Sequence, residues 1–323
     1  MNFQEFKAFR DQVTEEKSLL RLDCMNPFKA MSFLKVDVAN QVDCSSEDTL
    51  DLWAETMSAH KHRNRAIATG GVRESLKGLF NIFSSNGKEV WLPEDTYPFY
   101  WDTAHNVGLK PQSFPTLPTP DLSVLDKADK DSVAVITNPL SPLGRTLNKD
   151  EVTQICEWLE VSKDRQIILD TVYSYTRDFD AATQKIFETG QCYIAHSLSK
   201  AWLERGVFGV LLPPKKEFEA CQRILKTPSK DACTSAFSAL KEQNDLADTQ
   251  QHAFSQEWNR LKPLIQNLAP DFQVPKTGYF SSVSINYKDA LEEHGALVIP
   301  ASVFGARNNT SSIVSCLYNA KPS

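Results

Sequence analysis

The sequence predicts an α/β protein, a three-layer sandwich around a mostly parallel sheet, with a smaller C-terminal α/β domain. Short apolar runs alternate with helical patterns along much of the chain. Its 323 residues are enough for a large core and a satellite domain. After Pro213 and Pro214 the alternation gives way to long helical patterns. We therefore expect an N-terminal arm over 1–30, a large domain over 31–212 and a small domain over 213–323.

The expected strands are short runs rich in apolar residues that stop at polar or turn-forming residues. Those of the main sheet are 65–68, 89–92, 110–114, 132–137, 166–170, 192–196 and 207–212. Further strands are expected at 19–24, 279–285 and 296–299. Apolar residues at helical spacing predict helices at 2–17, 45–60, 72–83, 99–106, 149–162, 215–226, 232–245 and 249–268. This order of elements is typical of a parallel sheet with helical crossovers.

Composition excludes several classes of partner. Apolar residues make up 41% and charged residues 24% of the chain, with a net charge of -6, which argues against a nucleic-acid or anionic-membrane partner. No stretch approaches the roughly 18 apolar residues of a membrane span, and the N-terminus does not resemble a signal peptide. The seven scattered cysteines and six histidines show no disulfide or metal-binding pattern. We expect a cytoplasmic protein with reduced thiols and no bound metal.

Polar or glycine-containing segments follow five of the expected strands, at the edge where open α/β sheets bind ligands. They are 69–74, 96–98, 138–144, 170–173 and 197–200. The run from Thr69 to Val72 opens a helix, so its N–H groups could hold a phosphate. Tyr97 could cover a bound ring. Each segment alone is also typical of an ordinary turn, but together they predict one ligand site.

Lys200 and Asp170 indicate the chemistry of that site. A lysine behind small hydroxyl residues at a strand end, as in Ser197-Leu198-Ser199-Lys200, can form a Schiff base with an aldehyde cofactor. An acid one β-α unit earlier, here Asp170, can keep a pyridine nitrogen protonated. The pair predicts pyridoxal 5'-phosphate (PLP) as the cofactor.

In this order the segments resemble those of fold-type I PLP-dependent enzymes of the class I/II aminotransferase group, which includes aspartate and histidinol-phosphate aminotransferases. The resemblance runs from Asn26-Pro27-Phe28 to the last expected strand. It implies Lys200, Asp170 and Tyr173 as catalytic residues, with Tyr173 at the phenolic oxygen of PLP. With residues that stand in where the pattern is not matched, the expected cofactor-binding residues are Gly70, Gly71, Val72, Tyr97, Asn138, Ser141, Asp170, Tyr173, Ser197, Ser199, Lys200 and Arg205. It also suggests a homodimer.

Three positions depart from the pattern of that group. Ser141 stands where an asparagine usually binds the phenolic oxygen, so Asn138 or Tyr173 would have to serve. Phe208 stands where an arginine grips the phosphate, and Arg205 is the nearest substitute. Ile313 stands where an arginine holds the substrate carboxylate, and isoleucine cannot replace that bidentate group.

The substrate side is therefore expected to differ from the family's usual one. Asn26 and Arg307 are the expected substrate-binding residues, with Arg307 reaching in from a loop. The leading hypothesis is an aminotransferase for an amino acid or related small-molecule amine. A PLP-dependent decarboxylase, β- or γ-eliminating lyase or cyclase is the alternative. A non-catalytic PLP-binding protein is disfavoured, because a binding module needs no electron sink.

Overall fold

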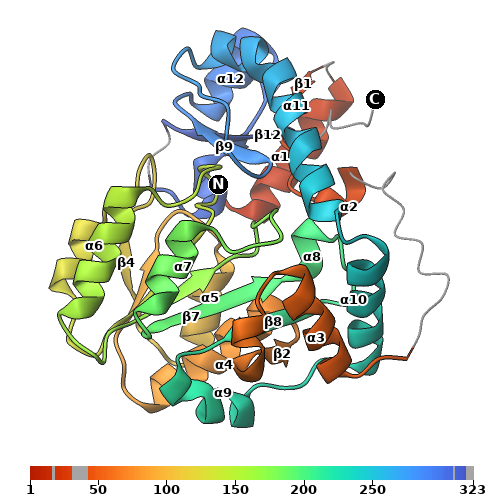
Figure 1. Cartoon of the computed structure of the whole chain (residues 1–323). Coiled ribbons are helices and arrows are strands. Elements are labelled where there is room, and N and C mark those ends of the chain that lie inside the picture. Colours follow the sequence, from red (N-terminus) through yellow and green to blue (C-terminus); the bar gives the residue numbers. More distant parts are fainter. Residues whose placement is uncertain (17–18, 31–42, 308–309, 318–323) are drawn as a thin grey trace.

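In a computed structural model, a mixed sheet of seven strands forms the centre of the molecule (Figure 1). The structure describes residues 1–16, 19–30, 43–307 and 310–317. The strands are β2 (Ile67–Thr69), β3 (Val90–Pro93), β4 (Gln112–Phe114), β5 (Val133–Thr137), β6 (Gln166–Asp170), β7 (Cys192–Ser197) and β8 (Gly209–Leu212). Their order is β2-β8-β7-β6-β5-β3-β4, and only β8 runs antiparallel to its neighbours. All seven strands lie close to the expected ranges.

Helices cover both faces of this sheet. The helices are α3 (Ser46–Thr56), α4 (Gly71–Ser85), α5 (Phe99–Asn106), α6 (Lys149–Glu160) and α7 (Ala181–Glu188). Alternate residues of β5 belong to different hydrophobic clusters: Val133 and Val135 pack with α4, whereas Ala134 and Ile136 pack with the cluster that includes α6 and α7. Strands buried on both faces read as continuous apolar runs, which is why the strand signal is strong in the sequence.

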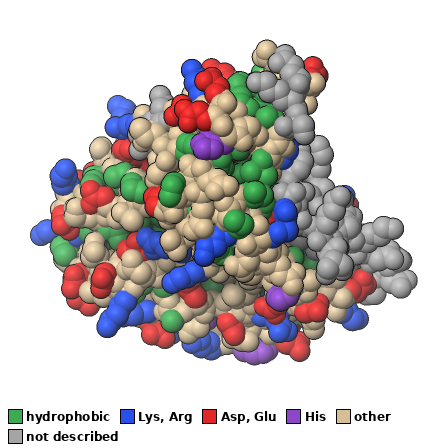
Figure 2. All heavy atoms as spheres, turned by 90° about the horizontal axis from the view of Figure 1, so that it is seen from above, with side chains coloured by type: hydrophobic (Ala, Val, Ile, Leu, Met, Phe, Trp, Pro, Cys, Tyr) green, Lys and Arg blue, Asp and Glu red, His purple; other side chains and the backbone are tan. Residues whose placement is uncertain are grey.

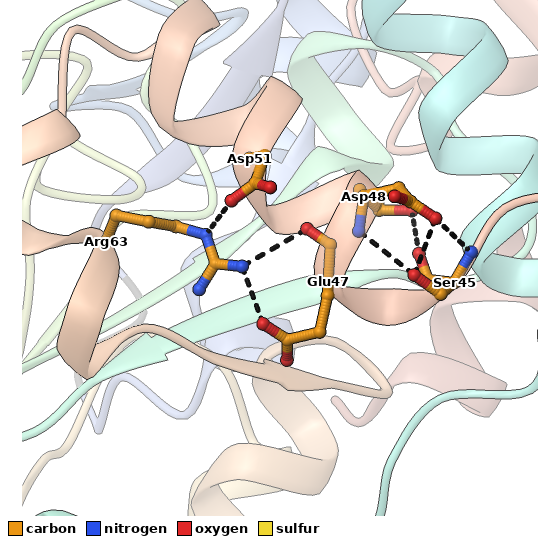
Figure 3. Close-up of polar contacts among 6 residues, drawn as sticks. Ser45, Glu47, Asp48, Asp51 and Arg63 are labelled. Carbon is orange, nitrogen blue, oxygen red and sulfur yellow. Dashed lines mark hydrogen bonds and ion pairs between the residues drawn. The ribbon is translucent and has the colours of Figure 1, made fainter.

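Charged side chains fix α3 to the turn that follows it. Ser45 and Asp48 form a capping box at the start of α3. Arg63, in the 3-10 turn η1 (His60–Arg65), pairs with Asp51 at 2.6 Å and with Glu47 at 2.7 Å (Figure 3). These exposed pairs contribute little stability each, but they hold η1 against α3 just before β2 begins.

A smaller unit lies beside the main sheet. It contains α11 (Leu246–Leu268), α12 (Tyr287–His294) and the antiparallel strands β9 (Phe280–Val283), β12 (Ser312–Ser315) and β11 (Ile299–Pro300). The N-terminal arm joins this unit, because β1 (Leu20–Arg21) pairs with β10 (Ala296–Leu297). Helix α1 (Phe3–Glu16) lies beside it in Figure 1, and Phe9 meets Tyr287 edge to face.

Several elements differ from the expectation. Helices α9 (Phe218–Ile224) and α10 (Lys230–Glu242) follow Pro214 in the chain, but they pack against α4 and α3 and so extend the larger unit. The expected strand at 296–299 is divided into β10 and β11, which join different sheets. The short helices α7 and α12 carry too few apolar residues at helical spacing to be predicted. The remaining short elements are α2 (Pro27–Ala30), α8 (Leu198–Ala201), η2 (Leu122–Lys127), η3 (Lys215–Glu217) and η4 (Ala301–Phe304).

A membrane span requires a long apolar helix. None of the helices in the described ranges is both long and apolar enough to cross a membrane. On the face in view in Figure 2, basic and acidic side chains are interspersed.

Candidate active site

A cavity of about 310 Å³ lies at the carboxyl ends of the parallel strands. It is lined by residues that follow β3, β5, β6 and β7, together with the first turn of α4. Eight of the residues expected at the cofactor line it: Val72, Tyr97, Ser141, Asp170, Tyr173, Ser197, Ser199 and Lys200. The parallel sheet brings them together because the carboxyl ends of its strands meet at one edge.

Lys200 lies in the short helix α8, directly after β7. The Ser197 side chain caps this helix by accepting a hydrogen bond from the Ser199 N–H, and Gln250 of α11 donates to the Lys200 carbonyl at 3.2 Å. Burial, assisted by the Arg73 guanidinium, lowers the pKa of Lys200 from its ordinary value to about 8. More of this amine is therefore neutral, and so nucleophilic, near neutral pH than in an ordinary lysine.

Asp170 ends β6 and is 3% exposed. The Tyr100 hydroxyl donates to its Oδ2 at 2.5 Å, and the Val172 N–H donates to its Oδ1 at 2.9 Å. Burial raises the pKa of the Asp170 carboxyl to about 6, although these two hydrogen bonds oppose the rise. The carboxyl is thus mostly ionised at neutral pH, and its orientation is fixed.

Aromatic side chains form the cavity walls. Tyr173 meets the rings of Tyr279 and Phe280 edge to face, and burial raises the pKa of Tyr173 to about 12. Its hydroxyl therefore stays protonated and able to donate at neutral pH. On another wall, Tyr97 stacks on Phe99, with ring centroids 5.7 Å apart.

The start of α4 approaches β8 too closely for larger residues. Gly71 has a φ of 80°, and a Cβ there would come within 3.0 Å of the Val207 side chain. A Cβ on Gly209 would lie 2.6 Å from the Gly71 Cα. Gly70 provides no side-chain cap for α4, so the first N–H groups of this helix remain available to an anion. The close approach of these backbones explains the glycine at position 71, where the helix that borders the cavity begins.

Phe208 and Ile313 occupy the positions where the family pattern has arginine, and both are buried with 0% exposure. The loop before Phe208 is organised by Glu204, which accepts hydrogen bonds from the Gly206 and Phe208 N–H groups and the Ser235 hydroxyl. Ile313 lies in β12 and pairs with Ile299 and Ser282. Both positions contribute to the core and cannot bind an anion.

Besides Gly70 and Gly71, the structure places four expected site residues outside the lining of this cavity. The Arg205 guanidinium lies over the Phe28 ring, 5.9 Å from its centroid. Arg307 is 78% exposed and pairs with Glu94 at 3.1 Å. Asn26 caps the short helix α2, its Oδ1 accepting from the Phe28 N–H at 3.0 Å. Phe28 itself lines the cavity.

Asn138, the fourth of these residues, points to a different set of partners. Its amide donates to Asp180 at 2.9 Å and to Thr183 at 2.8 Å, and its carbonyl oxygen accepts from the Leu147 N–H at 2.9 Å. Asn138 thus links the end of β5 to the start of α7 and to the loop before α6. The sequence pattern correctly placed Asn138 at a strand end, but it could not show the direction of the side chain.

Sequence reasoning missed Tyr100, Arg73 and Thr96, all of which line the cavity. Tyr100 lies one helical turn after Tyr97, so the spacing could have suggested a second aromatic residue at the site. Arg73 stands in the glycine-containing segment itself. The Thr96 Oγ1 is buried with no hydrogen-bond partner among the described residues, and nothing in the sequence signals this.

Comparison with known families decides the classification. Residues 42–316 match the family described as aminotransferase class I and II. The chain belongs to this family. Family membership implies PLP as the cofactor, and the cavity fits it: the residues offer a buried carboxylate, an amine with a lowered pKa, an uncapped helix start and the unpartnered Thr96 hydroxyl.

Curated relatives are similar over shorter stretches. A histidinol-phosphate aminotransferase of Acinetobacter baumannii is 27% identical over 110 residues, covering 34% of this chain and 30% of that protein. An aspartate aminotransferase of Musicola paradisiaca is 26% identical over 183 residues, covering 53% of this chain and 45% of that protein. The chain therefore spans less than half the length of these relatives.

Solved structures agree over nearly the whole fold. An aspartate aminotransferase of Thermotoga maritima superposes with a TM-score of 0.72 at 16% identity, covering 98% of this chain and 92% of that chain. A PLP-bound C-S lyase of Staphylococcus hominis gives a TM-score of 0.70 at 12% identity, covering 94% and 88% of the two chains. These similarities confirm the expected fold class.

Proposed function

We propose that this protein is a PLP-dependent aminotransferase that acts on an amino acid or a related small amine. The observation that carries the proposal is the meeting of Lys200 and Asp170 in one cavity with the start of α4. A surface lysine would have no reason to line the same cavity as a buried carboxylate, with its pKa lowered to about 8.

Each residue would have a defined task. Bound PLP supplies an aldehyde for the substrate amine and a ring that accepts the electron pair released at the substrate carbon. Asp170 would hold a proton at the ring nitrogen, and Tyr173 would donate a hydrogen bond to the phenolic oxygen. Lys200 would carry the cofactor and, once displaced, move a proton to and from the substrate carbon.

The remaining lining residues would position the cofactor. Tyr97 would cover one face of the ring, and Ser141 would lie near Tyr173 at the phenolic oxygen. Val72, Ser197 and Ser199 would donate hydrogen bonds to the phosphate, along with the N–H groups that begin α4 at Gly71.

A PLP-dependent lyase is the second candidate, favoured by a specific observation. The position of the family's carboxylate-binding arginine is the buried Ile313, so the usual grip on an α-amino acid is missing there. Without this arginine, the substrate can be held in another orientation, so that a different bond at its reacting carbon is broken. The cofactor residues would stay the same.

Product analysis tests the proposal and separates the two reactions. Purified protein loaded with PLP would be mixed with a panel of amino acids and amines, with and without a keto-acid acceptor. Transamination predicts an oxo product and stoichiometric conversion of the cofactor to its amine form without an acceptor. Ammonia or CO2 released with the cofactor unchanged would establish the lyase, and no reaction in the presence of bound PLP would contradict both.

We also propose that the protein is cytoplasmic and forms a homodimer. The scattered cysteines support a reducing compartment. The dimer is supported by its resemblance to the class I/II aminotransferase group. Sedimentation of the PLP-loaded protein at the mass of two chains is the expected result.

A further inference from the structure

Only two cationic residues, Arg73 and Lys200, line the cavity in the part of the chain that the structure describes. The proposed function commits Lys200 to the aldehyde of PLP. The phosphate of PLP carries a charge of nearly -2 at neutral pH, and a cation beside it strengthens the hydrogen bonds that it accepts. Phe208 cannot supply that cation, because its side chain is buried in the core.

Arg73 lies where such a cation would be useful. It is the third residue of α4, two residues after Gly71, and this helix has no side-chain cap. Its guanidinium lies 5.4 Å from the ring centroid of Tyr97 and 5.0 Å from that of Phe99. It also donates a hydrogen bond to the Tyr97 hydroxyl. Two aromatic rings thus hold a mobile side chain against the cavity wall.

A second feature of the cavity fits a bound hydrogen-bond acceptor. The Thr96 side chain is 3% exposed, and its Oγ1 has no hydrogen-bond partner among the described residues. A buried hydroxyl without a partner costs free energy, which a bound acceptor would recover. Separately, the charge of Arg73 adds to the effect of burial in lowering the pKa of Lys200, in line with the presence of both side chains in the cavity lining.

We propose that Arg73 is the cation that binds the phosphate of PLP in this chain, in place of the arginine that the family has at the position of Phe208. Its planar guanidinium can form two parallel hydrogen bonds with a phosphate, beside the N–H groups that begin α4. This inference rests on the proposed function, because it assumes that PLP occupies the cavity. Arg205, the candidate suggested by the sequence, lies over Phe28 instead.

Binding of PLP and of pyridoxal, which lacks the phosphate, tests the assignment. The dissociation constants of both compounds would be measured on cofactor-free protein by absorbance and tryptophan fluorescence. In Arg73→Ala, PLP binding should weaken roughly 10- to 100-fold, the loss expected for a charged hydrogen-bonded pair. Pyridoxal binding should change less than about 2-fold, because pyridoxal has no phosphate for Arg73 to contact in the wild-type protein. In Arg73→Lys, the dissociation constant of PLP should fall between those of wild type and Arg73→Ala.

Matched variants separate the phosphate role from others. Lys77→Ala removes the same charge from an exposed site one turn further along α4, and it should leave both dissociation constants within about 2-fold of wild type. An equal loss of PLP and pyridoxal binding in Arg73→Ala would show that Arg73 only supports Tyr97, and would overturn the proposal. A phosphate-specific loss in Arg205→Ala but not in Arg73→Ala would overturn it too.

The remaining outcomes are also decisive. Unchanged PLP binding in Arg73→Ala, with weakened binding of a carboxylate-bearing amine, would assign Arg73 to the substrate and overturn the phosphate role. If wild-type protein binds PLP and Arg73→Ala binds it equally well, only this inference is contradicted. Wild-type protein that binds neither compound contradicts the proposed function as well.

Discussion

The cavity joins a wall built by the central sheet to a second wall, called the loop wall, built by loops and short helical turns outside that sheet. On the first, Asp170 ends β6, Lys200 lies in α8 directly after β7, and Gly71 begins α4 after β2, so the backbone of the sheet fixes their positions. On the second, Phe28 and Phe304 come from segments outside the sheet. The comparison shows where the chain retains the family pattern and where it departs. Asp170, Tyr173 and Lys200, which lie at or just after strand ends, follow the pattern, whereas Ser141 departs from it and the two arginine positions, Phe208 and Ile313, are buried in the core.

Lys200→Ala should have the largest effect, because it removes both the attachment point of the cofactor and the proposed general base. We expect turnover to fall by roughly 1,000-fold or more. Steady-state kinetics with the substrate identified by product analysis would measure it. Lys215→Ala, an exposed lysine in η3, should keep normal turnover. Normal turnover in Lys200→Ala would show that the sheet wall is not the catalytic wall.

Asp170→Asn should reduce turnover by roughly 100-fold, since an amide cannot hold the ring nitrogen in its protonated form. The same kinetics would measure it, with the exposed Asp178→Asn on the following loop as the control. A turnover close to that of wild type would remove Asp170 from the proposed mechanism.

The same variant has a pH-dependent effect on the cofactor-free protein. The pKa of Asp170 is raised to about 6 in the folded protein, so above pH 6 the fold contains a buried ionised carboxyl. Asp170→Asn removes this cost and should stabilise the cofactor-free fold by about 2 to 3 kcal/mol at pH 7.5. The gain should fade as the pH falls from 6 toward 4, where the folded wild-type carboxyl becomes neutral. Urea unfolding at several pH values would measure it, and a pH-independent difference would contradict the assignment.

Tyr100→Phe should have a smaller effect, because it removes one hydrogen bond to Asp170 and leaves the carboxyl in place. We expect about 10-fold lower turnover, together with an upward shift of the Asp170 pKa. The pH dependence of the bound cofactor's absorption would report this shift. Tyr193→Phe is the control, because Tyr193 is buried near the start of β7 and does not line the cavity. It should leave that pH dependence unchanged.

Arg307→Ala should have the smallest effect and tests the loop wall. Its side chain is 78% exposed and paired with Glu94, and exposed ion pairs contribute little. We expect substrate KM to change less than about 2-fold. An increase of 10-fold or more, with turnover unchanged, would show that Arg307 turns inward when substrate binds, and the loop wall would then carry the carboxylate contact.

Much of the fold could be predicted because its strands are buried on both faces. Such strands read as short apolar runs, and all seven of the main sheet were found near their observed ranges. The placement of α10 against α3 could not be predicted, since local sequence does not determine which unit an amphipathic helix covers. The division of 296–299 into β10 and β11 depends on pairing with distant segments, which is also a tertiary effect.

The candidate site divides in the same way. The strand-end positions of Asp170 and Lys200 follow from the order of elements, so their meeting could be predicted. Side-chain direction could not, and Asn138 therefore turned out to contact Asp180 and Thr183. Tyr100 was missed because its role arises only when α5 packs beside the end of β6.

The most direct test of the account is to find the residue that carries the cofactor. The protein would be incubated with PLP and reduced with borohydride, and its proteolytic peptides would be examined by mass spectrometry. We predict a stable phosphopyridoxyl group on Lys200, with none formed in Lys200→Ala. A group spread over exposed lysines at similar yield in both proteins, or no group at all, would contradict it.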